Sequence, residues 1–240
     1  MRALTALIKD LLTVRLYADR VLAISESDAR SYWRRLGNQG RVTTVPYFIP
    51  VAPIAAPRAR ARLCVCVTAV LDIPLAQDAL HNFCEMVSSL GSQQDDWSFC
   101  VIGSGRPRAP TPSRVRVLGQ VDSASQFLLG ATCVALLSDF GRGFKTKILE
   151  AIQAGCWVLL TPVLYSRLPA VITPFCITVQ PGADGNLASA LAKCDRPWPL
   201  GDPNAVLKRD AFAALDEVLG LDRCGGAAGA GDLRQTERRR

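Results

Sequence analysis

The sequence is poor in the residues that build metal centres. Its 240 residues include a single histidine, His81, and its nine cysteines contain no Cys-x-x-Cys pair. Zinc sites are usually built from closely spaced cysteines and histidines, so we expect no metal. His81 falls in a predicted helix beside Asn82, which favours a surface role over that of a catalytic base. The cysteines lie mostly in apolar stretches and are predicted to be small buried side chains in a reducing compartment.

Long apolar runs are also missing. No stretch reaches 18 apolar residues, the length needed to cross a membrane, and the first residues do not have the pattern of a signal peptide. We therefore expect a cytoplasmic protein, with peripheral contact at the inner face of the membrane left open. Hydrophobic residues make up 49% of the chain and charged residues 20%, which suits a sizeable buried core.

Acidic residues are too few to balance the basic ones, and the formal net charge is +7. Much of the excess is local, in the terminal run 238–240 and at Arg58, Arg60 and Arg62. An arginine-rich tail and linker explain it better than a nucleic-acid surface, so no nucleic-acid partner is expected. A ligand carrying a diphosphate, or an anionic membrane, would also suit a basic protein.

The chain divides by composition into five segments. Residues 1–50 have a helical pattern at 3–17, strands at 20–25 and 41–46, and between them a helix that Ser25 or Ser27 can cap and Gly37 can end. Prolines, alanines and arginines mark a linker at 51–62. A helix is predicted within 201–220, and the glycine- and arginine-rich stretch 221–240 is expected to be disordered.

The largest segment, 63–200, alternates between apolar strands and amphipathic helices. Continuous apolar strands between helices are typical of a sheet buried on both faces, which predicts an α/β fold with a Rossmann-like parallel sheet. Strands are expected at 63–68, 97–103, 115–118, 133–137, 156–161 and 175–179, and helices at 75–90, 123–129, 144–153 and 187–194.

One strand–loop–helix stretch, 138–160, carries the chemistry. Its loop contains Gly141 and Gly143, and its helix is expected to begin near Phe144. Glycines let a backbone approach a ligand closely, and a helix N-terminus offers free N–H groups and partial positive charge to an anion. Full charges come from Lys145 and Lys147, beside Thr146.

Glu150 lies on this helix, off the stripe of Phe144, Ile148, Ala151 and Ile152 that is expected to pack on the sheet. A carboxylate two turns from a phosphate site is placed to accept hydrogen bonds from two ribose hydroxyls. The alternative is a surface ion pair with Lys147, three residues earlier. Spacing alone does not separate the two.

Several segments together resemble the family-4 (group 1) glycosyltransferases of GT-B fold. The most specific is 147–159, Lys-Ile-Leu-Glu-Ala-Ile-Gln-Ala-Gly-Cys-Trp-Val-Leu, which is similar to the family's donor-site signature. The stretch 97–105 resembles its strand ending in Gly-x-Gly, at Gly103 and Gly105, and 115–121 resembles its hydrophobic-x-Gly-x-Val strand. Residues 18–25 and 42–46 are similar to the end of its first domain.

The resemblance implies a function and a donor site. Residues 63–200 would be the donor-binding domain, with Glu150 on the ribose and backbone amides of about Phe144 to Thr146 on the diphosphate. The reaction would transfer a hexosyl group, with retention at the anomeric carbon, from a nucleotide-sugar to a glycan or lipid-linked acceptor. No cofactor and no metal are implied, since the nucleotide-diphosphate sugar is a substrate.

The sequence departs from the family in three places. Arg142 stands where many members have a second glutamate, and 68–75 has no basic residue where members carry an arginine and a lysine. Residues 1–50 match only the end of an acceptor-side Rossmann-like domain, so we expect this remnant to pack on the donor domain or its last helix, or else to expose an apolar patch.

These departures leave alternatives to an active enzyme. The chain could be a catalytically inactive nucleotide-binding remnant, or one subunit of a split glycosyltransferase whose acceptor domain is another chain. A sugar-nucleotide epimerase of the same fold would need both domains.

Overall fold

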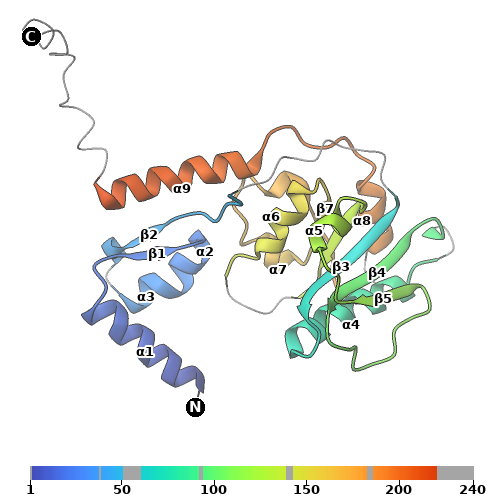
Figure 1. Ribbon diagram of the computed structural model, residues 1–240, viewed down its shortest axis with the longest axis horizontal. Helices are drawn as coiled ribbons and strands as arrows, with labels where there is room; N and C mark the ends of the chain where they lie inside the picture. Colours follow the sequence, from blue (N-terminus) through green and yellow to red (C-terminus); the bar gives the residue numbers. More distant parts are fainter. Residues whose placement is uncertain are drawn as a thin grey trace, which may run out of the picture.

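We describe a computed structural model of the chain, which covers residues 2–37, 39–50, 61–91, 94–138, 143–182 and 186–220. The chain forms a small N-terminal part and a larger part built on one sheet, and a long C-terminal helix reaches back to the N-terminal part (Figure 1). Most of the predicted linker (51–60), Arg142 and the predicted tail (221–240) lie outside the described residues.

The larger part is built on a six-stranded, wholly parallel sheet. Its strand order is β5-β4-β3-β6-β7-β8, which confirms the predicted α/β class. Each strand lies where an apolar run predicts one. The bounds are β3 (Leu63–Val70), β4 (Ser98–Ser104), β5 (Val115–Gly119), β6 (Cys133–Leu136), β7 (Trp157–Leu160) and β8 (Cys176–Thr178).

Helices cover both faces of this sheet, which explains why its strands are apolar throughout. Alternate side chains of β3 go to opposite cores, with Cys64 and Cys66 on one face and Val65 and Val67 on the other. The first face packs against α4 (Pro74–Ser88) and α8 (Leu187–Lys193). The second packs against α5 (Ala124–Leu128), α6 (Thr146–Gln153) and α7 (Pro162–Tyr165).

The N-terminal part contains α1 (Arg2–Leu16) and a two-stranded parallel sheet of β1 (Val21–Ala23) and β2 (Val42–Thr44). Between these strands the chain is helical from α2 (Glu26–Asp28) through a π-helical turn (Ala29–Trp33) to α3 (Arg34–Leu36). Ser25 caps this helix, because its side chain accepts a hydrogen bond from the Asp28 N–H at 3.1 Å. A 3-10 turn at Gln39–Arg41 leads into β2.

The last helix, α9 (Pro203–Leu219), joins the two parts. It runs from the six-stranded part to lie beside β2 (Figure 1). The Asn204 side chain donates to the Ile49 carbonyl at 3.0 Å and accepts from the Ile49 N–H at 2.7 Å. Phe48 stacks near Phe212, with ring centroids 5.7 Å apart. Residues before 50 therefore pack on the last helix, while Ile8, Leu12 and Leu16 of α1 remain exposed.

One local expectation is wrong, and one short helix has no counterpart in the prediction. Helix α6 begins at Thr146 rather than near Phe144, because Lys145 has extended backbone angles and serves as the N-cap. Helix α7 was not predicted, since four residues are too few for a period to show. Its start is marked by Thr161, whose hydroxyl accepts from the Leu164 N–H, and by Pro162 in the first turn.

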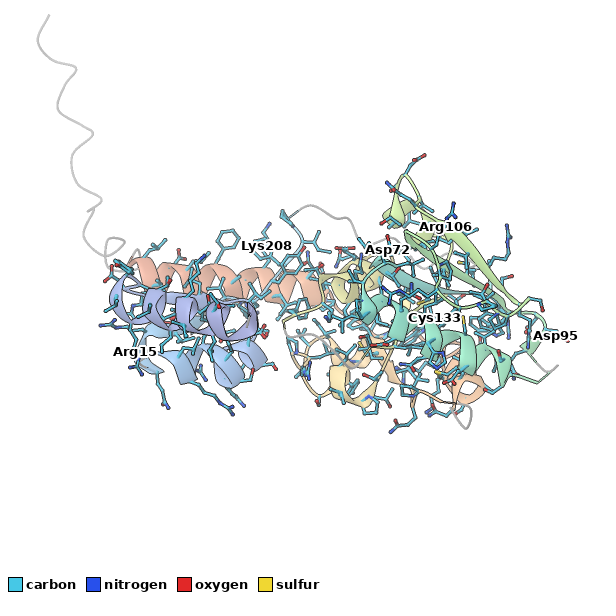
Figure 2. The ribbon with its side chains drawn as sticks, turned by 90° about the horizontal axis from the view of Figure 1, so that it is seen from below. Arg15, Asp72, Asp95, Arg106, Cys133 and Lys208 are labelled. Carbon is cyan, nitrogen blue, oxygen red and sulfur yellow. The ribbon has the colours of Figure 1, made fainter. Side chains whose placement is uncertain are left out.

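The thiols are structural, as their apolar surroundings indicate. The eight cysteines that the structure describes are free, and all but Cys84 are buried. Burial disfavours the thiolate and raises the pKa of Cys100 and of Cys176 to about 12. Figure 2 shows Cys133 within the six-stranded part. No helix in the described ranges is both long and apolar enough to cross a membrane.

Candidate functional site

The strand order sets the place of the site. From β3, in the middle of the sheet, the chain moves outward through β4 and β5, then returns to the other side of β3 at β6. In parallel α/β sheets, ligands bind at the carboxyl ends of strands where the order reverses in this way. Here that point lies between the ends of β3 and β6, near Thr68 and Ser138.

Two hollows open at this edge. The first has a volume of about 170 Å³ and runs between the ends of β3 and β6, α4 on one face of the sheet and α6 on the other. The second has a volume of about 250 Å³ and extends past the ends of β4 and β5, along Gly103, Gln120 and Val121. Three residues line both hollows, namely Val67, Thr68 and Lys147.

The start of α6 faces this edge. The backbone N–H groups of Thr146 and Lys147 in its first turn have no acceptor among the described residues, and the first turn closes with the Ile148 N–H donating to the Lys145 carbonyl at 2.9 Å. Free amides and the helix dipole make such an end attractive to an anion. Lys145 lines the first hollow and Lys147 lines both, so two full positive charges stand at the same place.

Glu150 lies one turn further along α6 and is half-buried. It is not among the residues that line the two hollows. No ion pair joins it to Lys147 in the part of the chain that the structure describes, so the alternative of a surface ion pair finds no support. Ribose recognition by Glu150 stays a prediction.

The glycine pair has a clear packing role. A side chain on Gly103 would place its Cβ 2.1 Å from Oγ1 of Thr68, so the end of β4 can lie this close to β3 only with glycine. Gly105 has a φ of +90° and would place a Cβ 2.8 Å from the carboxylate of Asp72. Gly103 lines the second hollow, whereas Gly105 lines neither.

Gly143 faces away from the two hollows and toward the N-terminal part. Its N–H donates to Oδ1 of Asp28 at 2.9 Å, and its φ of +92° favours glycine. Next to it, the ring of Phe144 lies 6.0 Å from that of Tyr47. The residues before α6 thus contact the N-terminal part, which the sequence did not predict, because Asp28 and Gly143 are 115 positions apart.

The first hollow is otherwise largely apolar. Ile73 and Leu75 line it in the stretch where the resembling family carries basic residues. Oγ of Ser138 is fully buried and has no partner among the described residues. An unpaired buried hydroxyl is costly to a fold. Because the stretch with Ile73 and Leu75 is apolar, the positive charge that lines the first hollow comes from Lys145 and Lys147, across the sheet from these two residues.

Residues 61–194 match the model of the family described as glycosyl transferases group 1. This match covers more than half of the chain. The chain belongs to the group 1 glycosyl transferases. It is thus a glycosyltransferase by family, and its six-stranded part has the Rossmann-like architecture of the GT-B enzymes.

Solved structures share this fold at low sequence identity. Anabaena HepE, in complex with UDP and glucose, is 13% identical with a TM-score of 0.67, and the match covers 91% of this chain and 67% of HepE. A sucrose-phosphate synthase from Thermosynechococcus elongatus is 16% identical with a TM-score of 0.60, covering 91% of this chain and 60% of that one.

WaaG, a glycosyltransferase involved in lipopolysaccharide biosynthesis, is 16% identical with a TM-score of 0.59, covering 89% of this chain and 65% of WaaG. At these identities the likeness shows the fold alone. No curated protein matches the sequence. No group of three or more histidine, cysteine, aspartate or glutamate side chains among the described residues is arranged to hold a metal ion.

Proposed function

We propose that this glycosyltransferase binds a nucleotide-sugar at the carboxyl edge of its sheet and transfers the hexosyl group, with retention, to a glycan or lipid-linked acceptor. One observation carries the proposal. Lys147 stands at the head of α6, above the switch point, and lines both hollows, so that one ligand extending through both would pass it. A nucleotide-sugar has that form, with its base and sugar joined by a diphosphate.

The chemistry of the site suits a diphosphate leaving group. When the bond to the sugar breaks, negative charge grows on the diphosphate, and groups already aimed at it stabilise the transition state. Lys145, Lys147 and the two free amides of the first turn of α6 provide that stabilisation. They take the role of the basic residues that the stretch 68–75 lacks.

The two hollows support a division of the site between the parts of the donor. The base lies in the second hollow, along Gly103, Gln120 and Val121, and Glu150 accepts hydrogen bonds from the ribose as it comes near α6. The sugar enters the first hollow beside Ser138. Support for a nucleotide-sugar donor comes from the neighbours, since Anabaena HepE is described with UDP and with UDP-glucose.

The proposal is tested by incubating the protein with UDP-glucose, ADP-glucose and GDP-mannose and following release of the nucleoside diphosphate. We expect release from one of them, with the freed or transferred sugar keeping the donor's anomeric configuration by proton NMR. Lys147→Met should lower the rate at least about tenfold, because a charge-assisted bond contributes about 1.5–3 kcal/mol.

Lys208→Met is the matched control. Lys208 is an exposed lysine on α9 (Figure 2). It lines neither hollow, so its loss should leave the rate unchanged. Equal rates for the two variants would contradict the proposed place of the diphosphate. Inversion at the anomeric carbon would contradict the retaining reaction while leaving the donor site intact.

A further inference from the structure

One hydrogen bond links the N-terminal part directly to the segment that leads into the donor-site helix. The Gly143 N–H donates to Oδ1 of Asp28 at 2.9 Å. Gly143 lies three residues before the first residue of α6, and Lys145, the N-cap, follows it closely. Gly143 is therefore part of the turn that leads into the first turn of α6.

Asp28 is itself held in place by two hydrogen bonds with Ser25. The Ser25 hydroxyl donates to its other carboxylate oxygen at 2.7 Å, and the Asp28 N–H donates to Oγ of Ser25 at 3.1 Å. Ser25 is only 5% exposed, so the carboxylate is oriented by a buried cap. A second contact joins the two parts nearby, where the ring of Tyr47 lies 6.0 Å from that of Phe144, the residue after Gly143.

We propose that Asp28 is a positioning residue for the donor site, an inference that rests on the function proposed above. Its carboxylate fixes Gly143, and with it the turn that presents Lys145 and the free amides of α6 to the diphosphate. The N-terminal part thereby contributes to donor binding without touching the donor. This explains why a polar bond crosses between the two parts at this loop.

In the opposite role, the Asp28 carboxylate would compete with the ligand, because it would bond to a backbone amide that a phosphate would otherwise bind. The geometry disfavours it. Gly143 lines a narrow crevice of about 10 Å³, together with Ser25 and Ser27, and lines neither hollow at the switch point. Lys145 lies between the two spaces, because it lines both this crevice and the first hollow. Asp28 therefore holds the loop from its far side.

The test compares Asp28→Ala, Asp28→Asn and Asp10→Ala with the wild type, measuring dissociation constants for a nucleoside diphosphate and for its parent nucleoside. The diphosphate is whichever of UDP, GDP and ADP binds the wild type. Asp28→Ala should weaken diphosphate binding about tenfold and leave nucleoside binding nearly unchanged, because only the diphosphate would contact Lys145 and the free amides that this turn presents.

Asp28→Asn keeps an oxygen that accepts from Gly143 and should restore most of the affinity. Asp10→Ala removes another carboxylate of the N-terminal part, one bonded to the Tyr32 hydroxyl at 2.6 Å, and should change thermal stability alone.

Each other outcome overturns the inference. Tighter diphosphate binding by Asp28→Ala and Asp28→Asn would identify a competitor, and unchanged binding by Asp28→Ala would identify a purely structural contact. Equal losses in Asp28→Ala and Asp10→Ala would mean that the N-terminal part acts only through stability. Failure of the proposed function appears differently, as a wild type that binds no diphosphate.

Discussion

Gly103 has no side chain with which to bind a ligand, yet the shape of the site depends on it. The backbone at this position passes so close to Thr68 that a Cβ would stand 2.1 Å from Oγ1 and 2.9 Å from the carbonyl oxygen. The obstacle includes backbone, which cannot turn away as a flexible side chain would. The ends of β3 and β4 form one wall of the second hollow only because position 103 is glycine.

Gly103→Ala should therefore destabilise the protein by about 2 kcal/mol or more, since both overpacking and the φ of +153° act against it. The measurement is urea denaturation of the wild type and variant. Gly91→Ala is the matched control, because no atom lies within 4 Å of a Cβ built there. Equal midpoints for the two variants would show that the strands separate at little cost.

At this scale the sequence predicts a helix start beside the two lysines but not its position. The sequence predicts that the helix beside Lys145, Thr146 and Lys147 begins near Phe144, and it begins two residues later. The bond between Asp28 and Gly143 was out of reach, because nothing in either local sequence indicates a contact between residues 115 positions apart.

At the scale of helices and strands, the carboxylate of Glu26 links the helical segment after β1 to β2. Glu26 accepts hydrogen bonds from the Thr44 hydroxyl at 2.6 Å, from Arg30 at 2.7 Å and from Arg34 at 2.8 Å. These bonds favour the charged form and lower the pKa of Glu26 from 4.5 to about 2, with the Thr44 bond the largest cause. Burial acts in the opposite direction, and the bonds from Arg30 and Arg34 lower the pKa further. The carboxylate joins α2, the π-helical turn, α3 and β2.

A pKa that is lower in the folded than in the unfolded state gives stability that is present above about pH 4.5 and is lost as the pH falls toward 2. We expect Glu26→Gln to be less stable than the wild type at pH 7 and the difference to shrink steadily below pH 4.5. Thermal unfolding from pH 7 to pH 3 measures this. A difference that stays constant with pH would mean that the charge of Glu26 contributes nothing.

The sequence predicts the helices and strands better than it predicts contacts between single residues. The six strands of the sheet are short apolar runs because helices bury both faces, and such runs are visible without a structure. The four-residue α7 and the π-helical turn at Ala29–Trp33 escaped, since neither changes the spacing of apolar residues enough to be seen.

The molecule as a whole is two parts joined by α9 and by the loop before α6. Asn204 is the best-defined joint, because its side-chain amide both donates to and accepts from the Ile49 backbone and is only 7% exposed. The sequence suggested that residues 1–50 would lie against the donor domain or its last helix, but it could not name this joint. Nothing in the local sequence indicates that the side-chain amide of Asn204 pairs with a distant stretch of backbone.

Asn204→Ala should leave the Ile49 N–H and carbonyl unpaired and lower the free energy of unfolding by about 1–3 kcal/mol. Urea denaturation checks the value, and limited proteolysis near residue 50 should become faster. Lys208→Ala, an exposed substitution on the same helix, is the control and should stay within about 0.5 kcal/mol of the wild type. Equal behaviour would mean that α9 is held to the N-terminal part by its apolar contacts alone.

The central claim is that the switch-point edge binds a nucleoside diphosphate, with Glu150 on the ribose. Its most direct test is the thermal stabilisation of the wild type and of Glu150→Ala by UDP, GDP, ADP and the matching monophosphates. At 100 times its dissociation constant, a ligand stabilises the fold by about 2.7 kcal/mol. We predict this for one diphosphate, with a weaker effect of its monophosphate and loss of most of the effect in a variant that remains folded. No stabilisation of the wild type by any diphosphate, or equal stabilisation of the variant, would contradict the account.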